Sequence, residues 1–139
     1  AGSGDMLVHV IRRVAKLGIA DRFHFTGFLR GDEVQKMFGM SDVYVMPSVS
    51  EPFGISPLEA MKSNVPVIIS KQSGVAEVLD YAIKVDYWDV DAMADAIYGL
   101  LKYPSLAAMS AEKGKSEVIN LKWDNAAGEV LDVYRSLVG

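Results

Sequence analysis

Hydrophobic positions along the chain follow two spacings, and each spacing predicts a different secondary structure. In several segments apolar residues recur every three to four positions, which is typical of a helix with one buried side. Gly18 and Asn64 follow two of these segments and suit the left-handed conformation that often ends a helix. The predicted helices cover residues 7–17, 32–38, 56–64, 76–79, 89–101, 104–119 and 124–138.

Short, uninterrupted apolar runs lie between these helices and predict strands. They cover residues 23–25, 43–46, 66–69 and 82–85. Continuous apolar runs are typical of a parallel sheet buried on both faces, whereas a half-exposed sheet would alternate. The order of elements therefore predicts an α/β fold, a Rossmann-like parallel sheet covered by helices on both faces. Ligands bind such sheets beyond the carboxyl ends of the strands, so the loops of interest are residues 2–5, 26–31, 47–55 and 70–75.

Composition narrows the class of protein. A chain of 139 residues suits one domain, and its 14 basic and 18 acidic residues argue against a broad nucleic-acid surface. The sequence has no cysteine, which excludes disulfides and thiolate metal sites and favours an intracellular compartment. No apolar run approaches the length of a membrane span. We expect His9 on a helix surface and His24 packed in a strand, and we predict no metal site.

The segment from Pro47 to Met61 carries the strongest chemical signal, because it leaves a strand and enters a helix. Gly54 allows the backbone to approach a ligand closely. The amides near Ile55 and Ser56 stand at the helix start, where an anion such as a diphosphate is favoured. Carboxylates at Glu51 and Glu59 could accept hydrogen bonds from the hydroxyls of a sugar or a ribose.

Simpler interpretations exist for the same residues. Ser56 and Glu59 have the spacing of a capping box, in which Glu59 would bond the backbone N–H of Ser56. Phe53 could be a core residue, and a single loop carboxylate such as Glu51 is usually solvated. Lys71 is expected to be a solvated surface charge.

Residues 51–61, with Glu-Pro-Phe-Gly-Ile followed by Leu-Glu-Ala-Met, resemble the Glu-x7-Glu signature of retaining glycosyltransferases with the GT-B fold. That group includes glycosyltransferase group 1 enzymes, sucrose synthases and glycogen synthases. Asp42, Pro47–Ser48 and Asn64–Ile68 also match its pattern, as do the glycine turn at residues 1–4 and the Phe-x-Gly strand end at Phe25–Gly27. The resemblance covers essentially the whole chain.

The resemblance implies a carboxy-terminal domain that binds a nucleotide-diphosphate sugar, part of a hexosyltransferase that retains the anomeric configuration. The sugar donor is a substrate, and no cofactor or metal is implied. Glu51 would be the catalytic residue that holds sugar hydroxyls, and Glu59 would bind the ribose. The remaining implied donor-binding residues are Phe53 and Gly54 at the sugar, Ile55 and Ser56 at the diphosphate, Phe28 and Leu29 at the base, and Gly2 and Gly27 in the glycine turn and strand end.

The same resemblance implies that residues 1–139 form only part of that domain, with C-terminal helices from about residue 104. A preceding strand and helix would supply a basic pair for the diphosphate. Their absence would leave a slot in the sheet, and a missing N-terminal domain would bind an acceptor sugar or lipid-linked glycan. We therefore expect this chain to be inactive alone, and its parent enzyme to be cytoplasmic or peripheral on the inner membrane face. Ser73 and Asn64 depart from the pattern, since each replaces a glycine.

Two other functions stay open from the sequence. A nucleotide-sugar epimerase can share the fold, and the stretch from Ser73–Gly74 to Glu77 has some likeness to one. A non-catalytic α/β binding module is the second alternative. An epimerase would change the donor without an acceptor, and an assembly module would bind no nucleoside diphosphate.

Overall fold

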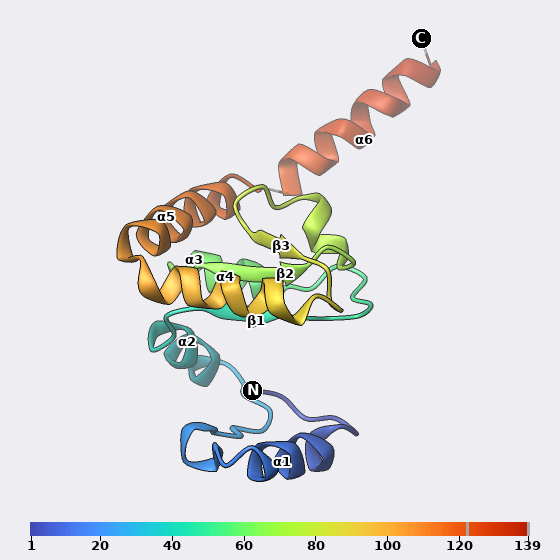
Figure 1. Ribbon diagram of the computed structural model, residues 1–139. Coiled ribbons are helices and arrows are strands. Elements are labelled where there is room, and N and C mark those ends of the chain that lie inside the picture. The colour runs from blue at the N-terminus through green and yellow to red at the C-terminus, as the bar shows by residue number, and fades with distance from the viewer. Residues whose placement is uncertain (122, 139) are drawn as a thin grey trace. The chain divides into compact units, whose positions relative to one another are not determined.

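The computed structural model describes residues 1–121 and 123–138. The chain divides into two compact units, Ala1–Met37 and Phe38–Gly139 (Figure 1).

The first unit is built around helix α1 (Leu7–Lys16), which buries Val14. A 3-10 turn, η1 (Ala20–Arg22), follows, and helix α2 (Asp32–Gly39) begins before the unit ends. Gly18 has φ 68° directly after the α1 cap, and its N–H bonds Ala15 O at 3.1 Å. The predicted left-handed residue at this helix end is therefore confirmed.

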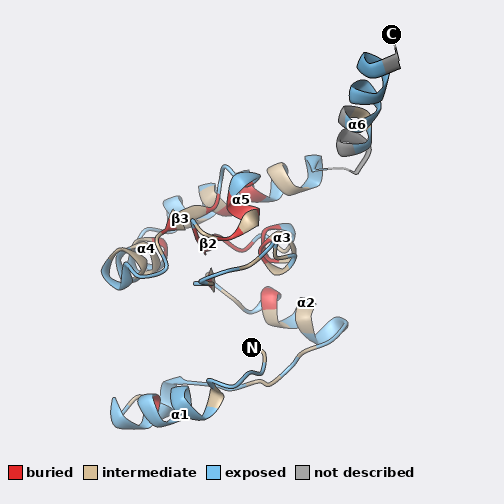
Figure 2. Cartoon of the chain, turned by 90° about the vertical axis from the view of Figure 1, so that its right-hand side faces the viewer, coloured by how far each residue is buried: buried red, intermediate tan, exposed pale blue. Residues whose placement is uncertain are grey.

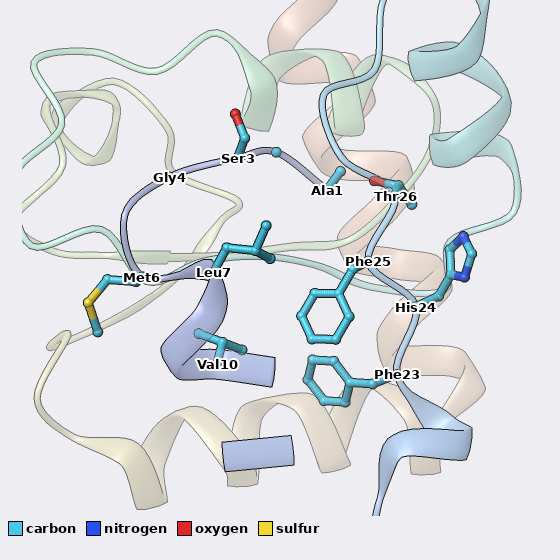
Figure 3. A pocket seen from close by; sticks show the side chains of 11 residues that line it. Ala1, Ser3, Gly4, Met6, Leu7, Val10, Phe23, His24, Phe25 and Thr26 are labelled. Atoms are coloured by element: carbon cyan, nitrogen blue, oxygen red, sulfur yellow. The ribbon is translucent and has the colours of Figure 1, made fainter. Parts of the chain in front are cut away.

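The predicted strand at residues 23–25 is wrong. Phe23 is extended, with φ −117° and ψ 126°, but the segment forms no ladder with any strand of the described chain. An extended segment becomes a strand only when a neighbour pairs with its backbone groups. Phe23 and Phe25 instead stack at 5.5 Å between ring centroids and face a pocket, with His24 on the other side of the segment (Figure 3). His24 is exposed, so the expectation of a packed histidine is also wrong, whereas His9 is exposed as expected.

The second unit contains a parallel sheet in the order β1-β2-β3. Val45 pairs with Ile68, and Ile68 pairs with Ile83. The central strand is wholly buried, as its uninterrupted apolar run predicts. The strands, β1 (Tyr44–Met46), β2 (Val67–Ser70) and β3 (Ile83–Val85), confirm three of the predicted apolar runs.

Helices cover both faces of this sheet, which confirms the predicted α/β class. Helix α3 (Ser56–Lys62) lies on one face and helix α4 (Val90–Lys102) on the other (Figures 1 and 2). On the α4 side, Ile68, Val85 and Leu100 form a buried cluster. The predicted helix at residues 76–79 is instead the 3-10 turn η2 (Gly74–Glu77).

Helix α5 (Pro104–Asn120) packs against α3 and α4. Gly114 lies in its middle, where a Cβ atom would stand 3.2 Å from Met61 Cε and Cγ of α3. The glycine therefore permits close approach of two helices. At the far end of α5, the Glu117 carboxylate accepts hydrogen bonds from the backbone N–H groups of Asp80 (2.6 Å) and Tyr81 (3.2 Å).

Helix α6 (Trp123–Val138) begins within one residue of its predicted start near Asp124. Its apolar residues Val130, Leu131, Tyr134 and Leu137 are exposed. Among the described helices, none combines the length and the apolar character needed to cross a membrane.

Candidate functional site

The loop that leaves β1 is hydrogen-bonded to the loop that leaves β2. The backbone N–H of Gly74 donates to Glu51 O at 2.8 Å, and that of Val75 donates to Phe53 O at 3.0 Å. Glu51 and Ser73 form an isolated parallel bridge beyond the ends of the two strands. Residues 51–53 are thus an extension of the sheet ladder, which fixes the backbone on both sides of Pro52.

Serine hydroxyls strengthen the same junction. Ser70 Oγ donates to Ser48 O at 2.6 Å, and Ser73 Oγ donates to Ser70 O at 2.7 Å. Both serines are buried. Ser73 stands where the family pattern has glycine, and its hydroxyl therefore supplies a hydrogen bond to the buried carbonyl of Ser70 at the end of β2.

Glycine is required at two positions in this junction. A Cβ at Gly74 would overlap the carbonyl oxygen of Pro52. Gly54 has φ 84°, a conformation that L side chains rarely adopt, and a Cβ there would lie 3.1 Å from Glu51 Cγ and 3.3 Å from Met46 Cε. Glu51 and Met46 thus leave no room for a side chain at Gly54, and its close approach to a ligand stays a prediction.

Backbone donors are unoccupied at the end of this loop. The N–H groups of Phe53, Gly54, Ile55 and Ser56 bond to no acceptor in the described chain. The side chains of Phe53 (44% exposed) and Ile55 (68% exposed) face solvent, so Phe53 is not a core residue. Successive free N–H groups around a left-handed residue form a concavity that suits an anion.

The predicted capping box is wrong. Ile55 precedes the helix with φ −80° and ψ −31°, Ser56 is the first helical residue, and no side chain caps the start. The Ser56 hydroxyl instead forms a hydrogen bond of 2.7 Å with the Tyr44 hydroxyl. The Glu59 carboxylate receives no hydrogen bond from any described residue, so it is free to accept one from a ligand.

Tyr44, on β1, is joined through its hydroxyl to the first residue of α3. Burial raises the pKa of its phenol; the Ser56 hydrogen bond lowers it, and the negative charges of Glu51 and Glu59 raise it further. Sequence reasoning treated Tyr44 as an apolar strand residue, although a hydroxyl in an otherwise apolar strand just before the motif is a signal for it.

Four other predicted donor-binding residues lie in the first unit. Gly2 N donates to Gly27 O at 2.6 Å, with φ 111° at Gly2 and φ 70° at Gly27. Phe28 is 69% exposed, its ring lies 5.4 Å from the Arg30 guanidinium carbon, and Leu29 is half-buried. The structure thus brings Gly2, Gly27, Phe28 and Leu29 together in one unit, and Glu51, Phe53–Ser56 and Glu59 in the other.

Lys71 is not a simple solvated charge. Its ammonium bonds Asp86 Oδ2 at 2.9 Å, and Gln72 Nε2 bonds Asp86 Oδ1 at 2.9 Å. The Lys71 hydrogen bond, followed by that of Gln72, lowers the pKa of the Asp86 carboxyl. Across the described residues, no group of three or more histidines and acids is gathered in a way that could hold a metal ion.

Comparison with known proteins identifies the family. A model of the family described as glycosyl transferases group 1 matches residues 1–117. An uncharacterised glycosyltransferase of Methanocaldococcus jannaschii is 34% identical over 140 residues, which cover 97% of this chain and 36% of that protein.

Solved structures agree on the fold. Sucrose-phosphate synthase from Thermosynechococcus elongatus superposes with a TM-score of 0.80 at 27% identity, over 99% of this chain and 37% of the other. HepE of Anabaena in complex with UDP-glucose superposes with a TM-score of 0.80 at 19% identity, over 95% of this chain and 37% of the other. At this identity the likeness supports only a shared GT-B fold. The chain spans about a third of the length of these relatives. The chain belongs to the glycosyl transferases group 1 family.

Proposed function

We propose that this chain is the donor-binding part of a retaining glycosyltransferase that uses a nucleoside diphosphate sugar. The observation that carries the proposal is the loop after β1, in a member of this family: Glu51 lies in its sheet extension, four of its backbone donors are unoccupied, and it leads into the helix that carries Glu59. The structural relative HepE, crystallised with UDP-glucose, supports a donor of this class.

Each group in the loop has a part of the donor that it would bind. The amides of Ile55 and Ser56 would hold the diphosphate, and those of Phe53 and Gly54 would contact the sugar. The Glu51 carboxylate would accept hydrogen bonds from sugar hydroxyls, and Glu59 would accept them from the ribose.

In the first unit, Phe28 and Leu29 would meet the base through their backbone, next to the glycine pair Gly2 and Gly27. Phe28 is exposed, which is compatible with a base at this segment.

The chemical step would replace one bond at the anomeric carbon with another. As the bond to the diphosphate breaks, the nucleoside diphosphate departs with the electron pair and its negative charge grows. Backbone N–H groups fixed by the sheet extension would stabilise that charge without reorganising. Glu51 would orient the sugar while an acceptor hydroxyl gives up its proton to the departing diphosphate and forms the new bond on the face that the diphosphate leaves, which retains the configuration.

We also propose that the acceptor site and a basic pair for the diphosphate belong to other parts of the complete enzyme. The chain alone would then bind the donor without transferring the sugar. The acceptor would be a sugar or a lipid-linked glycan, and the proposed reaction requires no further cofactor.

Calorimetry with UDP, GDP and ADP tests donor binding directly. In the complete enzyme, Glu51→Gln is expected to lower kcat about 100-fold or more, because it replaces the carboxylate beside the reacting sugar with a neutral amide. Glu59→Gln is expected to raise the KM for the donor about tenfold at nearly constant kcat. Glu112→Gln, at an exposed site on α5, is the matched control and should behave as the wild type.

Three outcomes would contradict the proposal. Failure of the wild type to bind any of the three nucleotides would favour a non-catalytic module. Conversion of the donor sugar in the absence of an acceptor would identify an epimerase. Robust sugar transfer by the 139-residue chain alone would refute the division of labour between this chain and the rest of the enzyme.

A further inference from the structure

Tyr44 has no part in the donor contacts proposed above, yet it joins two elements of the site. Its hydroxyl lies 2.7 Å from Ser56 Oγ, so strand β1 is linked by side chains to the first turn of helix α3. Both residues are half-buried. A hydrogen bond in such surroundings is stronger than one in water, and it defines where the helix starts relative to the strand.

Tyr44 is held in place by a ring contact and by a backbone hydrogen bond. Its ring packs edge-on against Phe38, with centroids 5.8 Å apart and planes at 65°. Its backbone N–H donates to Pro66 O at 2.9 Å, at the entrance of β2. Tyr44 is therefore a well-restrained side chain, and its hydrogen bond to Ser56 restrains the start of α3 in turn.

Ser56 and Glu59 stand three residues apart in α3. Residues at this spacing lie on the same side of a helix, so fixing the Ser56 side chain also fixes the direction from which Glu59 projects. Glu59 has no hydrogen bond of its own to a described residue that would orient it. Besides the backbone bonds of the helix, the Tyr44–Ser56 bond is thus a side-chain restraint on the turn that carries Glu59.

We infer that Tyr44 is a positioning residue for the donor nucleotide: through Ser56 it holds the first turn of α3 so that Glu59 can bind the ribose hydroxyls. This inference rests on the proposed function of Glu59. Because the hydroxyl pair is neutral, it restrains the turn without neutralising either carboxylate. The effect should appear in nucleotide affinity and not in the chemical step, since Tyr44 acts through a group that holds the nucleoside.

The test compares Tyr44→Phe, which keeps the ring and its contact with Phe38, with Ser56→Ala. Calorimetry of the wild type with UDP, GDP and ADP selects the tightest nucleotide, which is then used throughout. Each single variant is expected to raise its Kd about fivefold, and the double variant no more than either single one. Ser56→Thr keeps a hydroxyl and should restore most of the affinity. Tyr98→Phe, which removes an exposed hydroxyl on α4, should leave Kd unchanged.

A second background separates positioning from a purely structural role. In Glu59→Gln, Tyr44→Phe should change Kd less than twofold, because the group it positions is already impaired. In the complete enzyme Tyr44→Phe should raise the donor KM at nearly constant kcat. A fall in Tm with unchanged Kd, or the same fivefold effect in both backgrounds, would overturn the inference alone. Absence of nucleotide binding by the wild type would overturn the proposed function and this inference with it.

Discussion

The two groups of candidate donor-binding residues differ in how firmly their backbones are held. The loop from Glu51 to Ser56 is bonded to residues 73–75, and Gly54 and Gly74 are both crowded by neighbouring atoms. In the first unit, the Gly2–Gly27 pair is joined by one backbone hydrogen bond, and a Cβ at either glycine would meet nothing within 4 Å. In this chain, one group of candidate residues therefore lies on a fixed frame and the other on an open turn, and substitutions should affect the two differently.

The largest effect is expected for Gly74→Ala. The added Cβ cannot coexist with the Pro52 carbonyl, so the loop after β2 must separate from residues 51–53. We expect a loss of about 3 kcal/mol or more in the free energy of unfolding, measured by urea denaturation, together with loss of nucleotide binding. Gly128→Ala, at a helical glycine with open space around it, is the control and should be neutral or slightly stabilising. Equal behaviour of the two variants would contradict the fixed frame.

A smaller contrast is expected between Gly54→Ala and Gly27→Ala. Both glycines have positive φ, so each alanine should cost about 1–2 kcal/mol from backbone strain. Only Gly54 is also crowded, by Glu51 and Met46, which should add about 1 kcal/mol more. Thermal unfolding monitored by circular dichroism compares them. A larger loss of stability for Gly27→Ala would show that the first unit is the more tightly constrained one.

Ser70→Ala should have the next largest effect on the frame. It removes the hydroxyl that donates to Ser48 O and leaves that carbonyl without this partner beneath the loop. About 1–2 kcal/mol of unfolding free energy should be lost in a urea titration. Ser136→Ala removes an exposed hydroxyl that bonds Val133 O in α6, and it should change stability by less than about 0.5 kcal/mol.

The smallest effect is expected at Asp86. Its folded-state pKa lies below the ordinary value, so folding favours the charged form, and the stabilisation is present at neutral pH. As the pH falls below the ordinary carboxyl value toward the lowered one, that stabilisation is lost. Asp86→Asn should therefore lower Tm slightly at pH 7, and the difference from the wild type should shrink at acidic pH. A Tm difference that persists at acidic pH would assign the effect to packing rather than to the bond with Lys71.

The sequence predicted the elements that depend on local pattern. Strand β2 is apolar at every position but its last, and the glycine-like role of Asn64 is confirmed by its φ of 64°. Whether residues 23–25 form a strand could not be predicted from their own sequence. A strand requires a neighbouring strand to pair with, and the apolar pattern of one segment does not show whether such a neighbour exists. The Glu51-to-Glu59 motif located the loop, and the family is confirmed.

What the sequence did not reveal were the contacts that support the site. Serine is a residue type that favours helix N-caps, but the Ser56 hydroxyl is hydrogen-bonded to the phenol of Tyr44. Only the folded arrangement of strand and helix can show that bond. Likewise Ser73 was considered only as a replacement of a glycine in the family pattern, whereas its hydroxyl donates to Ser70 O at the end of β2. In both cases a tertiary partner outweighed the local preference of a short polar side chain. The individual roles of the site residues stay predictions.

The bridge between Glu51 and Ser73 has a consequence for how affinity can be adjusted. A loop that continues a sheet ladder is preorganised, so little conformational entropy is lost when a ligand settles on it. Selectivity for one sugar over another would then depend on which side chains this rigid loop carries, and far less on rearrangement of the loop backbone. Enzymes with new donors could be made from this scaffold by exchanging such side chains while residues 73 and 74 stay untouched.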